Sequence, residues 1–341
     1  MTSGSVMAAE MAEQPAILRR LIGQRDDLLA RVRAILPSPP VRVVVVARGS
    51  SDHAGIYGRY VLEHAARTPV ALAAPSLQTR YGVQTDYHGY LAIAASQSGR
   101  TPEIVTALEQ MGSRGAVTIA VTNDADSPLA HSADLALTLG AGPERAIPAT
   151  KTFTAQLAVF ALLAEAIGPV PWSDADWATI APSVEAALAD PAPAASVADE
   201  IGDARAAVVL ARGFLFSVAL EAALKLKETT SLLAWADSTA DFRHGPIAVV
   251  DSDLPVLTFS AIGPCAADVA EITRAIRARG GHVLSIADVP GADLPIPAGV
   301  PEALATVPAA VRAQQLALAL ARYRGLDADT PAGLSKITAT A

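Results

Sequence analysis

Residues 43–49 read VVVVARG, and residues 207–213 read AVVLARG. Each stretch is an apolar run with the length of a β-strand, ends in Ala-Arg-Gly and precedes a segment with helical patterning. The second copy begins 164 residues after the first, which is close to half of the 341-residue chain. This spacing predicts that one α/β unit is duplicated along the chain.

Apolar strand patterns alternate with helical patterns around both stretches. In the first half we expect strands near residues 41–47, 69–74, 90–95, 116–122 and 134–139, and helices at 52–67, 102–113 and 150–168. In the second half we expect strands near 206–211, 255–260 and 281–287, and helices at 215–232, 266–279 and 306–323. Such apolar, β-branched strands are typical of parallel sheets covered on both faces. The predicted fold is α/β, with two parallel sheets, each flanked by helices in a doubly wound, three-layer arrangement.

The pattern divides the chain into three segments. Residues 1–36 are expected to be an N-terminal helical segment, broken at Gln14-Pro15. Residues 37–190 are expected to form a first domain, and residues 191–341 a second. The stretch at 190–195 is rich in proline and alanine and is predicted to be the linker between them.

Composition excludes several classes of protein. The net charge is −8 and no basic stripe exists, which argues against a nucleic-acid partner. The single cysteine, Cys265, cannot form an internal disulfide, and no cysteine spacing suits a metal. No signal-peptide pattern is evident, and the longest apolar helical candidate, 155–167, is too short to span a bilayer. We therefore expect a cytoplasmic protein with no membrane segment, metal or cofactor.

The clearest functional signal is the sequence SQSGRT at residues 96–101, which follows an expected strand and precedes an expected helix. Backbone amides of such a loop point outward where a helix dipole begins, so the loop can hold an anion. Ser96, Ser98 and Thr101 add hydroxyl groups. Because the lysine of a nucleotide P-loop is missing, the loop suggests a small phosphorylated ligand.

The sequence ALEAALKLKE at residues 219–228 is predicted to be helical, with Glu221, Lys225 and Glu228 on one face. Their pattern permits two interpretations, an acid–base site or a solvated helix face with ion pairs. His244 precedes Gly-Pro and is therefore expected in a tight loop, where its imidazole can move a proton. A loop histidine without a function is the alternative.

Two further stretches carry candidate residues. Lys336 lies in the C-terminal tail between Leu334 and Ile337, which we expect to hold it against the core. A desolvated lysine can form a Schiff base with a carbonyl. Glu144 and Thr150 lie in a loop that leads into a helix. Thr150 is either a helix N-cap or, with Glu144, part of a second ring of polar groups around the ligand.

Together these stretches resemble the sugar isomerase (SIS) family and, more narrowly, the isomerase half of the glutamine–fructose-6-phosphate aminotransferases. The matching stretches run in the family's order over nearly the whole chain. They are EQP at 13–15, ARGSS at 47–51, SQSGRT at 96–101, AGPE at 141–144, ATKTF at 149–153, ALEAALKLKE at 219–228, HGP at 244–246 and D-x-P-x-x-L-x-K at 329–336.

The resemblance implies two SIS domains and a homodimer. It implies that the sugar phosphate is held by loops of the first domain, at Ser51, Ser96, Gln97, Ser98 and Thr101. It also implies roles for four residues of the remaining chain. Glu228 moves a proton between C1 and C2, His244 opens the sugar ring from the partner subunit, Lys336 engages the open-chain carbonyl and Lys225 lies near the substrate.

The sequence departs from the family pattern in two ways. It contains no glutaminase domain, so the expected enzyme handles free ammonia, and Ala149 replaces a family serine near the sugar. The leading interpretation is the conversion of glucosamine 6-phosphate and water into fructose 6-phosphate and ammonium. The alternatives are a deglycase or isomerase for another phosphorylated amino sugar (galactosamine 6-phosphate or a fructosyl-amino acid phosphate) and a non-catalytic sugar-phosphate sensor.

Overall fold

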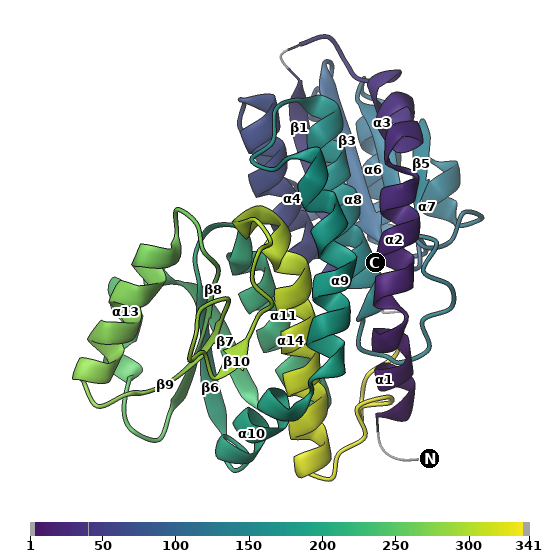
Figure 1. Ribbon diagram of the computed structural model, residues 1–341. Coiled ribbons are helices and arrows are strands. Elements are labelled where there is room, and N and C mark those ends of the chain that lie inside the picture. The colour runs from purple at the N-terminus through teal and green to yellow at the C-terminus, as the bar shows by residue number, and fades with distance from the viewer. Residues whose placement is uncertain (1–3, 40, 337–341) are drawn as a thin grey trace. The chain divides into compact units, whose positions relative to one another are not determined.

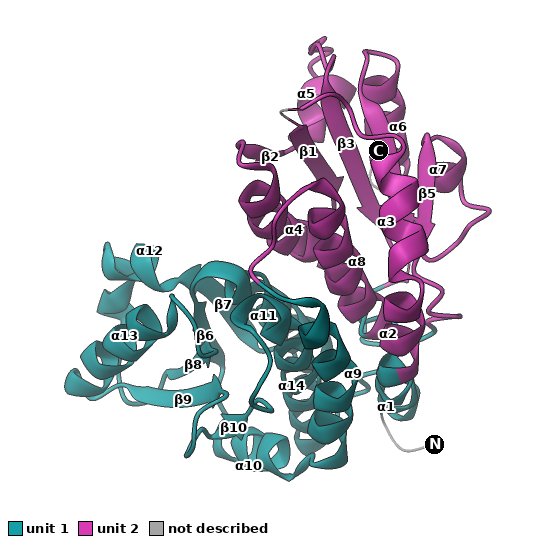
Figure 2. Cartoon of the chain, turned by 45° about the horizontal axis from the view of Figure 1, so that its top comes forward, with its two compact units in different colours: residues 1–15, 145–150, 172–334 teal, residues 16–144, 151–171, 335–341 magenta. Residues whose placement is uncertain are grey.

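The computed structural model describes residues 4–39 and 41–336, and the chain divides into two compact units (Figure 2). We call residues 16–144, 151–171 and 335–341 the first-sheet unit, drawn in magenta. Residues 1–15, 145–150 and 172–334 form the second-sheet unit, drawn in teal. Each unit contains one parallel five-stranded sheet.

The sheet of the first-sheet unit has the strand order β2-β1-β3-β4-β5. Its strands are β1 (Arg42–Ala47), β2 (Val70–Leu72), β3 (Tyr90–Ser96), β4 (Val117–Thr122) and β5 (Leu135–Thr138). The helices of this part of the chain are α2 (Gln14–Gly23), α3 (Arg25–Arg33), α4 (Ser50–Ala66), α5 (Pro75–Thr79), α6 (Pro102–Gly112), α7 (Pro128–His131) and α8 (Lys151–Ile167).

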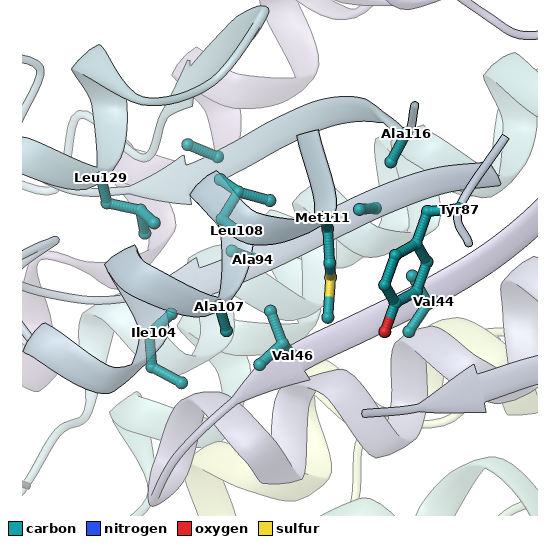
Figure 3. Packing of buried hydrophobic residues seen from close by; sticks show 12 residues of the cluster. Val44, Val46, Tyr87, Ala94, Ile104, Ala107, Leu108, Met111, Ala116 and Leu129 are labelled. Atoms are coloured by element: carbon teal, nitrogen blue, oxygen red, sulfur yellow. The ribbon is translucent and has the colours of Figure 1, made fainter. Parts of the chain in front are cut away.

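Both faces of this sheet are covered because successive strand residues point to opposite sides. On one face Val44 and Val46 of β1 pack with Leu108 and Met111 of α6 (Figure 3). On the other face α4 approaches so closely that a Cβ at Gly55 would lie 3.1 Å from Val45 Cγ1. The three layers follow from strands that are apolar on both sides, as the sequence predicts.

The second-sheet unit has the strand order β10-β9-β8-β6-β7. Its strands are β6 (Ala206–Ala211), β7 (Leu233–Ser238), β8 (Pro255–Ser260), β9 (His282–Ala287) and β10 (Leu294–Pro295). Its helices are α1 (Ser5–Ala12), α9 (Asp174–Ala189), α10 (Ala192–Glu200), α11 (Phe216–Thr230), α12 (Thr239–Arg243), α13 (Ala266–Ala278) and α14 (Glu302–Tyr323), with 3₁₀ turns at Gly213–Leu215 and Pro246–Val249.

The two sheets share one topology, read in opposite directions. In each, the first strand along the chain lies between the second and the third, and the fourth and fifth follow beyond the third. Figure 1 labels the neighbouring strands β1 and β3 of one sheet and β6 and β8 of the other. The predicted α/β fold with two parallel sheets is therefore confirmed, and the repeated topology agrees with a duplicated unit.

Several elements differ from the sequence expectation. Residues 192–200 form α10 rather than a linker, because Pro191 is the N-cap residue and Pro193 lies in the first turn, where a missing N–H costs nothing. The N-terminal segment is helical as expected, and its expected break at Gln14-Pro15 is confirmed, because α1 ends at Ala12 and α2 begins at Gln14. β7 and β10 were not expected, and α14 begins at Glu302 instead of residue 306.

Among the described residues, α14 is the one helix long and apolar enough to cross a membrane by length and composition. The window concerned is 94% buried within the protein, which is the position of a core helix.

Candidate functional site

Two loops of the first-sheet unit meet where its strand order reverses. From β1 the chain passes to β2 on one side, whereas β3 lies on the other, with Ala47 opposite Ala95. The loops after β1 and β3 therefore leave neighbouring carboxyl ends, the place where open α/β sheets bind ligands. Gly49 lies in the first loop with φ 58°, and a Cβ there would meet no atom within 4 Å, so the space in front of it is open.

Ser51 lies in the first turn of α4 and is buried. Its hydroxyl accepts a hydrogen bond of 2.9 Å from Gln156 Nε2, on α8. Sequence analysis missed Gln156, and the signal was an amide within the apolar stretch of α8. The bond orients Ser51 at the mouth of the first loop.

The loop at residues 96–101 is closed by its own serine. Ser96 is buried at the end of β3, and its Oγ accepts from Gly99 N at 3.2 Å and lies 3.4 Å from Thr101 Oγ1. Gly99 has φ 63°, and a Cβ there would lie 2.1 Å from Ser127 Oγ. Only glycine fits this position, for both reasons. The hydrogen bond to Ser96 and the conformation of Gly99 thus fix the backbone path of this loop.

Two amides of this loop are available for a ligand. In the part of the chain that the structure describes, the backbone amides of Ser98 and Thr101 donate to no acceptor. Thr101 is the N-cap residue of α6, but its side chain makes no capping bond. Gln97 O, by contrast, accepts from Asn123 N at 3.1 Å and anchors the loop to the end of β4. Two amides without an acceptor among the described residues, at the amino end of an eleven-residue helix, have the arrangement that commonly binds anions.

The nearby arginines are ion-paired. Arg48 NH2 lies 2.9 Å from Glu103 Oε2, and Arg100 NH2 lies 2.8 Å from Asp124 Oδ2. Because these carboxylates partly neutralise the guanidinium groups, amides and hydroxyls are the main donors that the loop offers to an anion.

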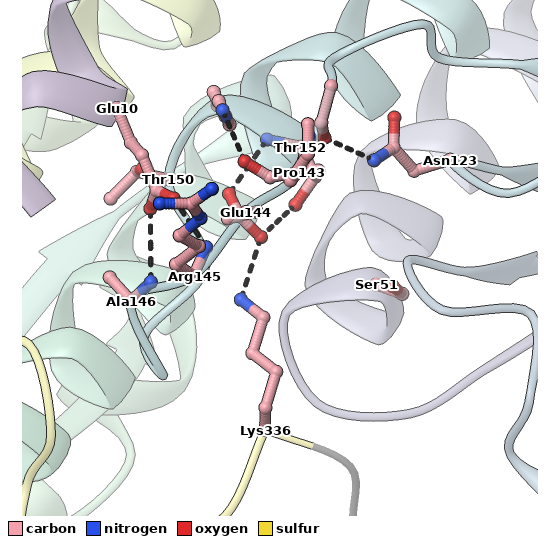
Figure 4. Close-up of polar contacts among 12 residues, drawn as sticks. Glu10, Ser51, Asn123, Pro143, Glu144, Arg145, Ala146, Thr150, Thr152 and Lys336 are labelled. Carbon is pink, nitrogen blue, oxygen red and sulfur yellow. Dashed lines mark hydrogen bonds and ion pairs between the residues drawn. The ribbon is translucent and has the colours of Figure 1, made fainter. Parts of the chain in front are cut away.

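Glu144 and Lys336 form a second polar group in the first-sheet unit (Figure 4). The Glu144 side chain is fully buried, and it accepts from Thr152 Oγ1 at 2.7 Å and from Thr152 N at 3.2 Å. Lys336 Nζ lies 3.0 Å from Glu144 Oε2. The expectation about the neighbours of Lys336 was wrong for Leu334, which is 44% exposed, and Ile337 lies outside the described residues. The carboxylate of Glu144, rather than an apolar clamp, positions Lys336.

α11 of the second-sheet unit carries the acidic and basic residues predicted to share a face. Lys225 is completely buried, with its Nζ 3.3 Å from Glu221 Oε1 and in contact with Glu228 Oε2. Burial alone lowers the pKa of Lys225, but the two carboxylates outweigh it and raise the pKa above its usual value. Glu221 is buried as well, so the interpretation of this face as a solvated one does not hold.

Glu228 differs from its two neighbours because its side chain remains 21% exposed. It lines a cavity of about 520 Å³ in the second-sheet unit. The other lining residues are Leu224, Lys227, Thr229, Ser231, Leu326, Asp327, Thr330, Pro331, Ala332 and Leu334. α11 therefore presents the carboxylate of Glu228 to a cavity that a small molecule can enter. The buried ammonium group of Lys225 forms an ion pair with this carboxylate.

His244 lies in the loop that the sequence predicts, between α12 and the 3₁₀ turn at Pro246–Val249. Its backbone is fixed by a bond of 2.9 Å from His244 N to Asp241 O, whereas the side chain is exposed. Gly245 has φ 135°, a value that disfavours any other residue there. The ring is thus presented to solvent from a fixed turn.

Thr150, the last candidate, is buried directly before α8 and belongs to the second-sheet unit. Its carbonyl accepts from Gln314 Nε2 at 3.2 Å. The structure thus gathers the candidates in two groups. The first-sheet unit holds Ser51, Ser96, Gln97, Ser98, Thr101, Glu144 and Lys336, and the second-sheet unit holds Thr150, Lys225, Glu228 and His244. Within the described ranges, no cluster of His, Cys, Asp and Glu side chains is arranged to hold a metal ion.

Comparison with known proteins identifies relatives along almost the whole chain. The chain is 33% identical to "Glutamine--fructose-6-phosphate aminotransferase [isomerizing]" of Zymomonas mobilis and, likewise at 33%, to the Thermus thermophilus protein of that name. Each match covers 97% of this chain and 58% of the relative, so the chain spans somewhat more than half of the length of these relatives.

Solved structures share the fold. A "putative phosphosugar isomerase" from Silicibacter pomeroyi superposes with a TM-score of 0.81 at 34% identity, covering 95% of this chain and 99% of that one. A "Glucosamine-6-phosphate deaminase" from Thermotoga maritima superposes with a TM-score of 0.80 at 24% identity, covering 98% and 100%, a likeness that concerns the fold alone.

The family model of the SIS domain matches residues 38–166 and 200–318, one match over each of the two sheets. The resemblance inferred from the eight sequence stretches is thereby confirmed. The chain belongs to the SIS domain family.

Proposed function

We propose that this chain is a phosphosugar isomerase and deaminase that converts glucosamine 6-phosphate and water into fructose 6-phosphate and ammonium. The observation that carries the proposal is the loop at residues 96–101, in which the amides of Ser98 and Thr101 lack acceptors among the described residues. A phosphate group fits such a loop because its oxygens accept from backbone amides at a helix terminus. The proposal therefore places the phosphate end of the substrate at this loop.

Glu228 supplies the acid–base group of the proposal. It is partly exposed at a cavity, and Lys225 holds it from the buried side. The contact between Lys225 Nζ and Glu228 Oε2 fixes the position of the carboxylate that the proposal assigns as general base. The relatives that are 33% identical to this chain are named as isomerizing enzymes, which agrees with proton transfer between adjacent carbons.

The proposed reaction proceeds in three steps. His244 moves a proton between the ring oxygen and the C1 hydroxyl, so that the sugar ring opens to the aldehyde. Glu228 removes the proton from C2 and returns it to C1, which turns the 2-amino aldehyde into a ketimine with a C1 alcohol. Water then adds to C2, the C–N bond breaks, and ammonium leaves fructose 6-phosphate. The proposal assigns Lys336 to the open-chain carbonyl and assigns ring contacts to Glu144 and Thr150.

An ammonium-release assay tests this proposal. The purified protein is given glucosamine 6-phosphate, galactosamine 6-phosphate and a fructosyl-amino acid phosphate in separate reactions without glutamine. We expect ammonium and fructose 6-phosphate from the first. Turnover of one of the other two substrates alone would replace the substrate but keep the reaction class. If none of the substrates reacts while each binds, the chain is a sensor and the proposed function is wrong.

The matched variants are Glu228→Gln and Glu109→Gln. Glu109 is an exposed glutamate of α6, so its variant repeats the chemical change away from the proposed site. Glu228→Gln should lower kcat by about a hundredfold or more, the usual contribution of a general base. Glu109→Gln should leave kcat unchanged.

A further inference from the structure

The anion loop of the first sheet has a counterpart of the same length in the second sheet. Residues 96–102 read SQSGRTP, and residues 260–266 read SAIGPCA. Each run begins with the last residue of the third strand of its sheet and ends with the first residue of the next helix. Serine at the first position and glycine at the fourth are shared. The duplication thus includes the loop and not only the strands.

The Ala-Arg-Gly loops repeat in the same way. Gly49 and Gly213 follow β1 and β6 with φ values of 58° and 62°. Arg48 pairs with Glu103 at the start of α6, and Arg212 Nε lies 3.5 Å from Asp268 Oδ2 at the start of α13. The strand order of the second sheet also reverses at β6, between β7 and β8. We call the place where the strand order of a sheet reverses its switch point. The second sheet therefore has its own switch point, formed by the same kinds of loop as the first.

The two switch points differ in the space in front of them. A Cβ at Gly49 would meet nothing within 4 Å, whereas one at Gly213 would lie 2.7 Å from Cys265 Sγ and 3.8 Å from Glu302 Oε1. A Cβ at Gly263 would lie 2.3 Å from Glu302 Oε2. The side chain of Glu302, the first residue of α14, therefore fills the second switch point.

Carboxylates also approach this loop in the second sheet. The Glu302 carboxylate lies against it, because a Cβ at Gly213 would be close to both Cys265 Sγ and Glu302 Oε1. The Asp288 carboxylate accepts from Ile262 N at 2.9 and 3.0 Å. By position in the loop, Ile262 and Cys265 correspond to Ser98 and Thr101, whose amides have no acceptor among the described residues. The amide of Ile262 is thus satisfied by Asp288 in the second sheet, whereas the corresponding amide of Ser98 has no acceptor among the described residues.

The residues at one corresponding place in the two sheets differ in charge: Asp288 carries a carboxylate where Asn123 carries a neutral amide. Asp288 directly follows β9, and Asn123 directly follows β4, at the corresponding place. Asn123 instead uses its side chain on the 141–142 turn, with Nδ2 2.7 Å from Gly142 O and Oδ1 2.8 Å from Ala141 N. Glu302 is 7% and Asp288 8% exposed. Buried carboxylates persist where amides satisfy them, so the loop has kept its affinity for anions.

We propose that the second switch point is an anion site that the chain occupies with its own Glu302 and Asp288 carboxylates. The chain accordingly takes one phosphorylated ligand, in the first-sheet unit. Removing the two carboxylates opens a second site of the same chemistry, which accepts inorganic phosphate. This inference concerns binding and does not depend on the proposed reaction.

The test counts phosphate sites by titration calorimetry on the wild type and on the double variant Glu302→Ala, Asp288→Asn, in which asparagine reproduces Asn123. We expect the variant to bind one more phosphate per chain than the wild type. The control Glu302→Gln with Asp288 unchanged keeps the filling side chain and should gain no site. A folded double variant with no additional site overturns the proposal.

The single cysteine gives a readout located at the second switch point. Phosphate should slow alkylation of Cys265 in the double variant and leave it unchanged in the wild type. If the double variant does not fold, the alkylation rate of Cys265 in the wild type still tests the proposal. Protection of Cys265 by phosphate in the wild type would overturn it. A wild type that binds no phosphate, beside a variant that binds one at Cys265, would support this inference and contradict the phosphate assignment of the first loop.

Discussion

Lys336 Nζ lies 3.0 Å from Glu144 Oε2, joining the last described residue of the chain to a carboxylate that is fully buried. Thr152 holds the same carboxylate through its hydroxyl and its amide. The ion pair fixes the position of a primary amine that, by the proposed function, meets a carbonyl.

Lys336→Arg separates the charge of this residue from its nucleophilicity. Arginine can keep an ion pair with Glu144, but its guanidinium does not add to a carbonyl. We expect kcat to fall while the KM for the phosphosugar changes little. Borohydride reduction in the presence of fructose 6-phosphate should label the wild type and not the variant, as mass spectrometry can determine. Equal turnover of Lys336→Arg and wild type would remove the amine from the mechanism.

The phosphate loop predicts an effect on substrate affinity. Ser98→Ala and Thr101→Val each remove one hydroxyl, and a hydrogen bond to a charged partner is worth about 1.5–3 kcal/mol. We expect Kd for a phosphosugar to rise about tenfold to a hundredfold in each variant. Ser113→Ala is the matched control, because Ser113 caps the far end of α6 and its hydroxyl donates only to Gln110 O within the described chain. Unchanged Kd in both loop variants would place the phosphate elsewhere.

Lys225 predicts a pH-dependent effect on stability. Its pKa in the folded protein is raised by Glu221 and Glu228 against the effect of burial. Such a lysine contributes stability that is fully present below its unfolded pKa, roughly 10.4, and is lost only as the pH rises through the folded value. The wild type should therefore keep this contribution from pH 5 to pH 9 and lose it in strong alkali.

Lys225→Met leaves Glu221 buried without its cation, a change that costs roughly 3–5 kcal/mol for a buried pair. The loss should be largest near pH 8 and smaller near pH 5, where Glu221 can take up a proton. Thermal unfolding at both pH values measures it, with Lys227→Met on the exposed side of α11 as control. A loss independent of pH would show that packing, rather than charge, makes Lys225 necessary.

We propose, from the resemblance of the sequence to the SIS family, that the exposed His244 serves the substrate of the partner subunit in a homodimer. If His244 serves the partner's substrate, a His244→Ala chain and a Glu228→Gln chain are each nearly inactive. Unfolded and refolded together, they should regain about a quarter of wild-type activity. Half of the randomly paired dimers are heterodimers, and each of these has one intact site out of two. Heterodimers demonstrated by differential tagging but without activity would contradict the shared site.

The sequence predicts those parts of the fold that depend on local pattern. The strands β1, β3, β4, β6, β8 and β9 are apolar runs buried on both faces, and each lies where expected. β7 was missed because its short apolar run, 233–236, directly follows the helix expected at 215–232. It lies at a sheet edge, where Leu233 is 70% and Trp235 41% exposed.

In the candidate site, too, the features that are local in sequence could be predicted, whereas the contacts between distant residues could not. The loop at 96–101 could be predicted because its serines, glycine and helix start are adjacent in sequence. The bond between Gln156 and Ser51, 105 residues apart, and the ion pair between Lys336 and Glu144, 192 residues apart, depend on the tertiary structure. So does the filling of the second switch point by Glu302, since nothing in the local sequence at residue 302 indicates an anion loop around residue 263.

Solvent deuterium incorporation tests the central claim most directly, because proton transfer at C1 and C2 by Glu228 is measured without reference to ammonia. Fructose 6-phosphate is incubated with the protein in D₂O, and deuterium at C1 is followed by NMR. The account predicts stereospecific exchange of one C1 hydrogen by the wild type and by Glu109→Gln, reduced about a hundredfold or more in Glu228→Gln. Equal exchange by wild type and Glu228→Gln, or no exchange by a wild type that binds the sugar phosphate, would contradict it.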